Sequence, residues 1–487
     1  MSHSVDLGLL VGDMLPGSQL PAIAVEGLSV DSRLVKAGDL FFAYPGTSAD
    51  GRDHIDEALA NGASIVLYES EYTEISYSDR GPLIPVSGVR EKVGVIAERF
   101  YGNPCRDLFV TGVTGTNGKT SCAHLLAQSL ESEGIRTGLI GTLGCGFVND
   151  LEKSALTTPD PVTLHRMLRD LRDRGATHVC MEVSSHALAQ GRVSGISFDA
   201  ALFTNLTHDH LDYHDGLEDY GAAKEILFRF PSLRFAVINA DDDFGRELAG
   251  RMTIPVRLYG VSSGDVTAET VTAEVSGLRL EIRTGQGKIR AHARLVGRIN
   301  VHNVLAVAAL LLAKGGTTSS VAQAIDALLP VPGRMELFPG ARSGLPSVVV
   351  DYAHTPDALE RALLSVREHC EGRVWCVFGC GGDRDRAKRP LMGAIAERLS
   401  DEVIVTDDNP RHEVPQAITD EIVMGMDSKP TVINDRVKAI RWAIESAGEA
   451  DWVLIAGKGH EDTQQVGDQF LPIDDRTIVS RCLGVAA

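Results

Sequence analysis

One short stretch, residues 110–120, constrains the fold and the chemistry of this chain more than any other. It reads Val-Thr-Gly-Val-Thr-Gly-Thr-Asn-Gly-Lys-Thr, follows an apolar segment and precedes a helical pattern of leucines. Glycines let backbone N–H groups approach a polyphosphate, and the N-terminus of the following helix favours anions. Lys119 is expected to reach the terminal phosphates, and the Thr120 hydroxyl suits Mg²⁺. The sequence therefore predicts a strand, a phosphate-binding loop and a helix that use a nucleoside triphosphate.

The loop departs from the strict P-loop pattern at one position. That pattern has a glycine five residues before Gly118, where this chain has Val113, and the glycines fall instead at 112, 115 and 118. A tight strand-to-helix turn without a ligand would also use glycines. Because Gly-Lys-Thr stands between an expected strand and an expected helix, nucleotide binding is favoured over that simpler interpretation.

The composition is that of an ordinary soluble protein with several domains. At 487 residues, the chain exceeds the size at which one hydrophobic core keeps growing. Apolar residues make up 44% of it, and no apolar run approaches the roughly 18 residues of a membrane span. The N-terminus lacks a basic region followed by an apolar core, so a cytoplasmic location is expected. A formal charge of −19 argues against a nucleic-acid partner, although a local basic pocket can still bind small anions.

The cysteines give no sign of a metal site or of disulfides. There are eight, and no two form a CxxC pair. The spacing of Cys370, Cys376 and Cys380 fits no common zinc site. We therefore expect buried, reduced thiols.

Turn-rich segments divide the chain at residues 102–104 and 330–333. Such punctuation is typical of domain borders. Strand and helix patterns alternate between these breaks and again after the second one, which predicts mostly parallel sheets covered by helices. We therefore expect three α/β domains, formed by residues 1–106, 107–332 and 333–487.

Hydrophobic periodicity and capping residues place the main elements. A clean alternation over 278–283, followed by Thr-Gly-Gln-Gly-Lys, predicts a β-hairpin. Thr355 and Pro356 together predict the start of a helix. Further strands are expected at 39–44, 63–68, 107–113, 137–141, 178–183, 201–206, 235–239, 348–350, 374–378, 403–405 and 453–456. Further helices are expected at 55–60, 118–133, 161–174 and 218–230.

Chemically active side chains gather at the ends of the central strands. Glu182 closes an apolar strand beside the phosphate-binding loop, where it would serve as a Mg²⁺ ligand; the simpler alternative is a solvated loop carboxylate. Residues 208–214 hold three His and two Asp, and this density suggests metal or phosphate chemistry, although any one of them could simply cap or pack. Lys224 lies in a helical stretch and, taken alone, is interpreted as a surface lysine.

Taken together, these motifs resemble those of a known family. Gly-Thr-Asn-Gly-Lys-Thr at 115–120 is joined by Glu-Val-Ser-Ser-His at 182–186, Asp-His-Leu-Asp-Tyr-His at 209–214 and Ala-Ala-Lys at 222–224. This set resembles the Mur ligases, the amino-acid-adding enzymes of bacterial peptidoglycan synthesis. Further matches to the family run in order along nearly the whole chain, at 31–33, 38–41, 333–336, 351–358, 379–385, 408–411 and 457–461.

The resemblance implies an α/β fold with a three-domain Mur ligase architecture. A UDP-substrate-binding domain would come first, then a central P-loop ATPase domain, then a Rossmann-like amino-acid-binding domain. In the implied reaction, ATP phosphorylates the D-glutamate side-chain carboxylate of UDP-N-acetylmuramoyl-L-alanyl-D-glutamate. The amine of a diamino acid then attacks the acyl phosphate, giving an amide, ADP and phosphate. Phosphoryl transfer between anions depends mostly on positioning and charge neutralisation.

The resemblance also implies roles for individual residues. The implied Mg²⁺ ligands are Thr120, Glu182, His210 and Lys224, with Lys224 carbamylated so that a cation becomes an anionic oxygen ligand; Lys119, His210 and Lys224 are implied as catalytic. The implied ATP contacts are Gly115, Thr116, Asn117, Gly118, Lys119, Thr120, Asn300, Asn303, Arg334 and Asp351. The implied UDP-dipeptide contacts are Val30, Ser32, Thr157, Thr158, Ser184, Gln190 and Arg192. The implied diamino-acid contacts are Arg384, Asp408, Asn409, Pro410, Arg411, Gly457 and Glu461.

Arg411 decides which amino acid the sequence favours. The resemblance implies that members with Asp-Asn-Pro-Arg, found here at 408–411, add meso-diaminopimelate, because a guanidinium group can bind its extra carboxylate. A surface arginine in an Asn-Pro turn is the simpler interpretation. A lysine-adding member of the family is one alternative, and a folylpolyglutamate synthetase is a more remote one. A non-catalytic nucleotide-binding module would explain the loop at 115–120 but not the His-rich segment.

Overall fold

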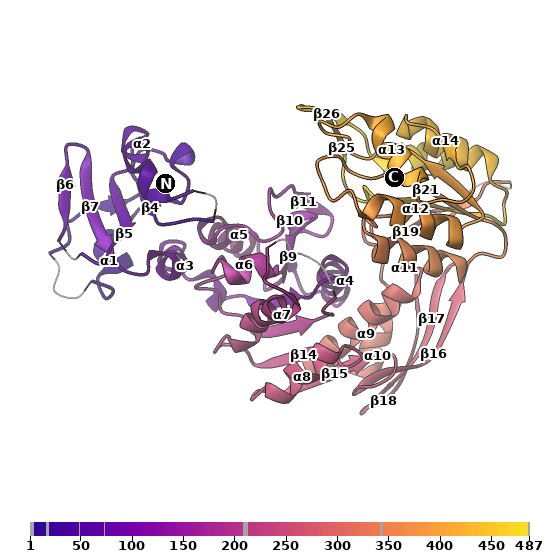
Figure 1. Cartoon of the computed structure of the whole chain (residues 1–487). Helices are drawn as coiled ribbons and strands as arrows, with labels where there is room; N and C mark the ends of the chain where they lie inside the picture. The colour runs from indigo at the N-terminus through magenta and orange to yellow at the C-terminus, as the bar shows by residue number, and fades with distance from the viewer. Residues whose placement is uncertain are drawn as a thin grey trace. The chain divides into compact units, whose positions relative to one another are not determined.

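The computed structural model describes residues 4–15, 19–47, 49–72, 74–207, 213–340 and 344–485 (Figure 1). The chain divides into two compact units, each with hydrophobic cores of its own. The first unit comprises Met1–Ala123, Gly134–Ile238 and Asp242–Val256; the second comprises His124–Glu133, Asn239–Asp241 and Arg257–Ala487. The expected domain boundaries after residues 106 and 332 stay predictions.

A five-stranded sheet opens the first unit. Its order is β3 (Gly27–Ser29), β4 (Asp39–Ala43), β5 (Ile65–Glu69), β7 (Gly81–Val86) and β6 (Ser76–Ser78), parallel except for the β7–β6 pair. The helices of this part are α1 (Leu7–Val11), α2 (Ile55–Ala60) and α3 (Val89–Phe100), and α3 buries an apolar face against the sheet core. The strands expected at 39–44 and 63–68 and the helix at 55–60 are confirmed.

The nucleotide-binding motif lies in a second, mostly parallel sheet of the first unit. The strand order is β11 (Asp150–Glu152), β10 (Gly144–Phe147), β9 (Thr137–Gly141), β12 (His178–Glu182), β8 (Phe109–Thr114), β13 (Ala200–Phe203) and β14 (Phe235–Asn239). The strands from β9 to β14 in this order are parallel. β10 pairs antiparallel with both β9 and β11. Nearly every residue of β8, β12 and β13 is buried, as expected of parallel strands covered on both faces.

An aspartate side chain caps the start of one helix of this part. In α5 (Pro161–Asp173) the Asp160 side chain accepts a hydrogen bond from the Thr163 N–H, and Pro161 occupies the first turn. The phosphate-binding loop leads into α4 (Lys119–Ser132), and α6 (Ser185–Ala189), α7 (Leu217–Glu225) and α8 (Asp243–Arg251) follow later in the chain. The strand expected at 201–206 ends earlier, at Phe203, because residues 204–207 hydrogen-bond to the phosphate-binding loop instead.

Three strands that pair antiparallel and an apolar helix come next in the chain. After β15 (Val256–Gly260), the strands β16 (Val266–Glu274), β17 (Gly277–Thr284) and β18 (Gly287–Ala293) pair in sequence, and the β17–β18 turn confirms the expected hairpin. The helices α9 (Arg298–Ala313) and α10 (Thr318–Asp326) follow. The sequence did not predict α9, because the helix is buried on nearly all sides and so lacks the polar face that gives a 3.6-residue period.

A doubly wound sheet ends the chain, in the order β19 (Glu336–Phe338), β20 (Ser347–Asp351), β24 (Trp452–Ala456), β21 (Val374–Phe378), β22 (Glu402–Val405) and β23 (Thr431–Val432). Only the β19–β20 pair is antiparallel. One face packs against α11 (Pro356–Arg367), α12 (Lys388–Leu399) and α13 (Pro415–Val423), and the other against α14 (Arg436–Ser446) and α15 (Asp475–Leu483). A short hairpin, β25 (Thr463–Val466) and β26 (Gln469–Pro472), lies outside this sheet.

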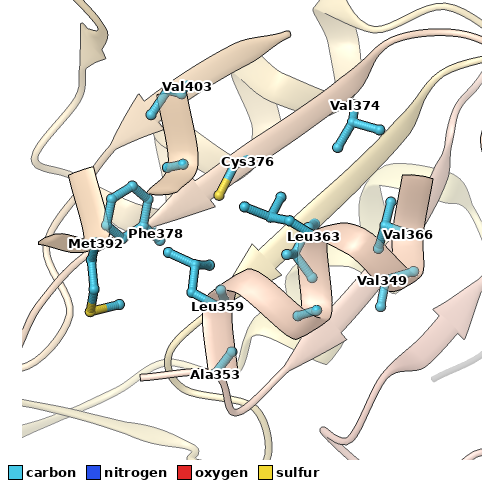
Figure 2. Close-up of a cluster of buried hydrophobic side chains, with 14 of the residues drawn as sticks. Val349, Ala353, Leu359, Leu363, Val366, Val374, Cys376, Phe378, Met392 and Val403 are labelled. Carbon is cyan, nitrogen blue, oxygen red and sulfur yellow. The ribbon is translucent and has the colours of Figure 1, made fainter. Parts of the chain in front are cut away.

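Successive residues of each strand face opposite sides of this sheet and so contribute to two different cores. Val349 and Cys376 contribute to the core beneath α11, whereas Val348 and Val377 face α14 and α15. Figure 2 shows Leu359 and Leu363 of α11 lying toward the strand residues of the first core. The Thr355 side chain caps α11 by accepting a hydrogen bond from the Ala358 N–H, as expected from its Thr-Pro start.

The prediction of buried thiols is confirmed for five of the eight cysteines, Cys105, Cys122, Cys180, Cys376 and Cys380, whereas Cys145, Cys370 and Cys482 are only partly buried. Burial raises the pKa of the Cys380 thiol to about 12, so it stays protonated at neutral pH. Over the part of the chain that the structure describes, no helix is long and apolar enough to cross a membrane.

Candidate active site

The turn between β8 and α4 has the backbone shape that a phosphate-binding loop needs. Gly115 and Gly118 adopt positive φ values of 148° and 86°, and a Cβ at Gly115 would lie 1.8 Å from Thr204 Oγ1. Only glycine fits there. Lys119 Nζ donates hydrogen bonds to the carbonyl oxygens of Gly115 at 2.9 Å and Thr116 at 2.8 Å, so its ammonium group lies directly over the loop. This geometry confirms the expected strand, loop and helix.

A second loop, residues 204–207 after β13, holds the phosphate-binding loop in place. The Asn205 side-chain oxygen accepts the Asn117 N–H at 2.9 Å, and its carbonyl oxygen accepts the Thr116 N–H at 2.8 Å. Thr204 Oγ1 donates to the Asn117 carbonyl oxygen at 2.6 Å. These contacts give hydrogen-bond partners to backbone groups of the phosphate-binding loop, because a buried N–H or C=O group without a partner is unfavourable. The sequence did not assign this role to Thr204 or Asn205.

Glu182 is buried beside Thr120 at the end of β12. It closes β12 and is only 2% exposed, so the alternative of a solvated loop carboxylate is wrong. Its Oε2 accepts a hydrogen bond from Thr120 Oγ1 at 2.8 Å, and its Oε1 accepts the Thr142 N–H at 2.7 Å. Mg²⁺ prefers oxygen ligands, and this carboxylate oxygen and hydroxyl oxygen are close enough to bind the same ion. The Thr120–Glu182 pair therefore fits the ion.

The remaining expected magnesium ligands are only partly described. Lys224 is 1% exposed, so the interpretation as a surface lysine is wrong. Its Nζ donates to the Gly115 carbonyl oxygen at 2.9 Å and lies 3.9 Å from the centre of the Tyr220 ring. His210 falls within 208–212, outside the described residues. Among the residues that are described, no three His, Cys, Asp or Glu side chains converge on one point.

The end of the His-rich segment has a structural role. His214 is buried; its Nε2 lies 3.0 Å from Ser185 Oγ and its Nδ1 lies 3.1 Å from Asp219 Oδ2. The ring thereby joins the start of α6 to α7. Of the three histidines in this segment, His214 therefore packs between helices.

The expected dipeptide contacts form one connected cluster in the first unit. Thr158 Oγ1 accepts the Ser184 N–H at 3.1 Å, and the Thr158 carbonyl oxygen accepts from Arg192 at 3.1 Å. Arg192 Nε also donates to Gln190 Oε1 at 2.9 Å, and burial lowers the pKa of its guanidinium group. Thr157 Oγ1 lies 3.0 Å from Thr142 Oγ1, which donates to Glu182. Hydrogen bonds therefore run from this cluster to the candidate magnesium ligand.

The two expected uridine contacts lie in the N-terminal sheet domain. Ser32 Oγ donates to Glu57 Oε2 at 2.6 Å, and the Ser32 carbonyl oxygen accepts from Asn61 Nδ2 at 2.9 Å. Val30 packs partly buried against the core of that domain. Both residues follow β3, at the carboxyl end of a parallel strand, where ligands bind in such sheets.

The expected ATP contacts of the second unit fall into two groups. On α9, the Asn303 side-chain amide donates to Asn300 Oδ1 at 2.9 Å, and Asn300 donates to the Val296 carbonyl oxygen at 2.9 Å, both buried. At the end of β20, Asp351 accepts the Met335 N–H at 2.7 Å, and burial raises the pKa of its carboxyl group. The Arg334 guanidinium group lies 4.4 Å from the centre of the Tyr352 ring.

The expected diamino-acid contacts come together around two loops, residues 408–411 after β22 and residues 457–461 after β24. Asn409 Nδ2 donates to Glu461 Oε2 at 3.0 Å. A Cβ on Gly457 would lie 2.5 Å from Asp408 Oδ2, so the two loops are in contact. Arg411 Nη1 donates to the Gly382 carbonyl oxygen at 2.7 Å. Asp408, Asn409 and Pro410 are buried, and Arg411 is partly exposed.

Arg384 lies on the same side of the sheet as Arg411. At Gly381, an added Cβ would lie 2.8 Å from Arg411 Nη1 and 3.7 Å from Arg384 Cγ. Both arginine side chains therefore lie next to Gly381. Arg384 is exposed, which leaves its guanidinium group accessible to an anionic ligand.

Comparison with known proteins shows the family. Residues 24–101 match the family described as "Mur ligase family, catalytic domain", residues 113–311 match "Mur ligase middle domain", and residues 333–459 match "Mur ligase, glutamate ligase domain". A UDP-N-acetylmuramoyl-L-alanyl-D-glutamate–2,6-diaminopimelate ligase from Coxiella burnetii is 46% identical over 463 residues, which cover 93% of this chain and 94% of that protein.

The chain belongs to the Mur ligase family. A solved structure of a UDP-N-acetylmuramoyl-L-alanyl-D-glutamate–2,6-diaminopimelate ligase is 34% identical, with a TM-score of 0.74 and 99% of each chain covered. A Mycobacterium tuberculosis folylpolyglutamate synthase, solved with ADP and AMPPCP, has a TM-score of 0.61 at 19% identity, covering 76% of this chain and 92% of that one. The likeness to the synthase shows a shared fold alone.

The sequence did not point to several residues of this Mur ligase that hold the loops of residues 408–411 and 457–461. Lys458 Nζ donates to Asn409 Oδ1 at 2.9 Å, and Gln464 Nε2 donates to the Asp408 carbonyl oxygen at 2.7 Å. The Arg411 N–H donates to the Gln465 carbonyl oxygen at 3.0 Å, so β25 pairs with this loop. The Gly-Lys-Gly-His-Glu motif at 457–461 was a signal for Lys458, but nothing in the sequence singles out the two glutamines.

Proposed function

We propose that this chain is an ATP-dependent ligase that adds meso-2,6-diaminopimelate to UDP-N-acetylmuramoyl-L-alanyl-D-glutamate in bacterial peptidoglycan synthesis, in the cytoplasm. The names of the similar proteins support it. The main structural support is the 3.0 Å hydrogen bond from Asn409 Nδ2 to Glu461 Oε2, which holds the 408–411 loop next to the Glu461 carboxylate. This arrangement offers both a guanidinium group and a carboxylate, which the distal carboxylate and ammonium of a diamino diacid require.

The proposed reaction has two steps. First, the D-glutamate side-chain carboxylate takes the γ-phosphoryl group of ATP, which gives an acyl phosphate and ADP. The diamino acid's amine then attacks the acyl carbon, forms the amide bond, loses a proton and releases phosphate. Because both initial partners are anions, the protein must mainly neutralise charge and hold the reactants in line.

Charge neutralisation falls to the phosphate-binding loop. We propose that residues 115–120 hold the phosphates of ATP, with Lys119 shifting from the two carbonyl oxygens that it now contacts. Thr120 and Glu182 would hold Mg²⁺, which neutralises phosphate charge when bound. Asn300, Asn303, Arg334 and Asp351 complete the proposed ATP contacts.

We propose that Lys224 works as a carbamate and, with His210, holds a second Mg²⁺. Its burial and its 2.9 Å hydrogen bond to the Gly115 carbonyl oxygen place its amine beside the loop that would hold the phosphates. An ammonium group there would repel a divalent cation. A carbamate formed from CO₂ would instead supply anionic oxygen ligands.

The acceptor substrate would use the cluster next to Glu182. We propose that Thr157, Thr158, Ser184, Gln190 and Arg192 bind the dipeptide part, and that Val30 and Ser32 bind the uridine nucleotide. Arg192 and Gln190 are held together by their hydrogen bond, so they offer a fixed set of donors for a carboxylate. The Thr157–Thr142–Glu182 hydrogen bonds connect this cluster to the residues that would hold the metal.

A product assay by mass tests the proposal. Enzyme, ATP, Mg²⁺ and UDP-N-acetylmuramoyl-L-alanyl-D-glutamate are incubated with one amino acid from a panel that includes meso-diaminopimelate and lysine. The proposal expects the mass of the diaminopimelate adduct, and phosphate release only when both substrates are present. A lysine adduct formed in preference would establish the lysine-adding alternative.

A further inference from the structure

Lys458 is a fully buried cation at the two loops of residues 408–411 and 457–461. Its side chain is 0% exposed, so its ammonium group presents no surface to a ligand. It lies between Gly457 and Gly459, which adopt positive φ values of 117° and 54° that glycine tolerates more readily than other residues. Burial lowers the pKa of its amine, while the neighbouring Asp408 and Glu461 carboxylates act in the opposite direction.

Two independent donors fix the orientation of the Asn409 side chain. Lys458 Nζ donates to Asn409 Oδ1 at 2.9 Å, and the backbone N–H of Gln465 donates to the same oxygen at 2.9 Å. Because a backbone N–H can only donate, the atom facing it must be the amide oxygen. The amide nitrogen must then face Glu461 Oε2, at 3.0 Å.

Lys458 also restrains Glu461 and the start of the hairpin. Its Nζ lies 3.5 Å from Glu461 Oε2 and donates to the Thr463 carbonyl oxygen at 2.8 Å. One buried ammonium group therefore holds the loop that carries Asn409, the carboxylate of Glu461 and the first residue of β25. Hydrogen bonds to a charged donor in a buried site are stronger than neutral ones.

We propose that Lys458 is a positioning residue for the amino-acid substrate, which sets the Asn409 amide and, through that amide and its own contact, the Glu461 carboxylate. This inference rests on the proposed function, in which Asn409 and Glu461 contact the diamino acid. Lys458 acts on the diamino acid only through these two side chains, because its own ammonium group is enclosed. Its loss would therefore weaken binding of the diamino acid and leave ATP binding unchanged.

A double-mutant cycle tests the inference on the full-length enzyme. Lys458→Met, Asn409→Ala and the double variant are compared for their KM values toward meso-diaminopimelate, ATP and the UDP-dipeptide. We expect Lys458→Met alone to raise the KM for diaminopimelate about tenfold, with the other two KM values within about twofold of wild type. In the Asn409→Ala background, the same substitution is expected to change that KM by less than about threefold.

Matched controls separate positioning from stability. Trp375→Phe removes a 3.1 Å hydrogen bond to Asp451 at the amino ends of β21 and β24, whereas the two loops follow the carboxyl ends of their strands. It is expected to lower the melting temperature without changing the KM for diaminopimelate. Lys458→Gln keeps a donor without the charge; it is expected to give an intermediate KM, and it replaces Lys458→Met if the latter does not fold.

The outcomes distinguish this inference from the proposed function. If Asn409→Ala raises the KM for diaminopimelate but the Lys458 variant does not, or raises it by the same factor in both backgrounds, Lys458 is not a positioning residue. If Asn409→Ala itself leaves that KM unchanged, the proposed amino-acid site is wrong, and the inference fails with it.

Discussion

The phosphate-binding loop and the 408–411 loop both follow parallel strands, but their backbones are held in different ways. At the phosphate-binding loop, glycines adopt the unusual conformations, with φ values of 148° at Gly115 and 86° at Gly118. At the other loop, Arg411 itself adopts a φ of 49°, which costs a non-glycine residue about 1 kcal/mol. Its N–H and carbonyl oxygen pair with Gln465 and Gly467 of the β25–β26 hairpin. Both loops also contact a distant segment, but the first owes its backbone shape to its own glycines, with residues 204–207 adding hydrogen bonds. Residues 408–411 include no glycine, so their strained shape depends on the distant hairpin.

The largest effect is expected at Lys224, beside the phosphate-binding loop. If a carbamate there holds a metal, Lys224→Ala should lower the ligation rate about a thousandfold or more. Added short-chain carboxylates should restore part of the rate, because they supply an anionic oxygen. Lys224→Arg should stay inactive, since arginine remains a cation. Rates of phosphate release with both substrates present measure this, and an active Arg variant would falsify the carbamate role.

The next test asks whether glycine is needed for the shape of the phosphate-binding loop. Gly115→Ala places a methyl group 1.8 Å from Thr204 Oγ1, and φ at this position is 148°. We expect ligation to fall about a hundredfold, with the KM for ATP raised. Gly134→Ala is the matched control, because Gly134 also has a positive φ of 80° but nothing lies within 4 Å of an added Cβ. Equal losses in both variants would contradict a specific role for the contact between residue 115 and Thr204.

A smaller effect is expected at the hairpin that supports Arg411. Gly467 has a φ of 57°, and an added Cβ meets nothing within 4 Å, so Gly467→Ala adds strain without a clash. We expect the KM for diaminopimelate to rise about threefold to fivefold while the KM for ATP stays constant. Steady-state kinetics with each substrate varied in turn measures both. If the KM for ATP rises equally, the hairpin does not act specifically on the 408–411 loop.

The features that the sequence predicted correctly are those set by local residues, as at the phosphate-binding loop. The Gly-Thr-Asn-Gly-Lys-Thr motif predicted the strand, loop and helix correctly, because glycine conformations and a helix start are local properties. Glu182 was also placed correctly, since it ends a recognisable apolar strand. In the C-terminal unit the strands at 347–351, 374–378 and 452–456 were found from their apolar runs.

Other parts lay beyond sequence reasoning for physical reasons. Asn205 contacts Asn117 across 88 residues of sequence, and Lys458 contacts Asn409 across 49, so neither role is visible in a local pattern. The helix α9 has no polar face, and the strand after residue 200 ends early because residues 204–207 bind another loop. The burial of Lys224 was likewise hidden, because its helix has little amphipathic character.

The last expected effect concerns stability, and not ligation, and it depends on pH. Burial lowers the pKa of His165 from 6.5 to about 4. Between these values the unfolded chain binds a proton that the folded chain does not, so this group lowers stability as pH falls from about 6.5 to about 4. His165→Gln should flatten that decline by up to about 1.4 kcal/mol per pH unit. Urea unfolding of both proteins at several pH values measures it, and parallel curves would contradict the assignment.

The most direct test of the account is the choice between meso-diaminopimelate and lysine. We compare kcat/KM of the wild type for each amino acid, with ATP and the UDP-dipeptide saturating, and repeat the comparison with Arg411→Ala. If the Arg411 guanidinium group binds the second carboxylate of diaminopimelate, the wild type should prefer diaminopimelate over lysine by about a hundredfold or more. Arg411→Ala should remove most of this preference. Equal kcat/KM for the two amino acids in the wild type, or an undiminished preference in Arg411→Ala, would contradict the account.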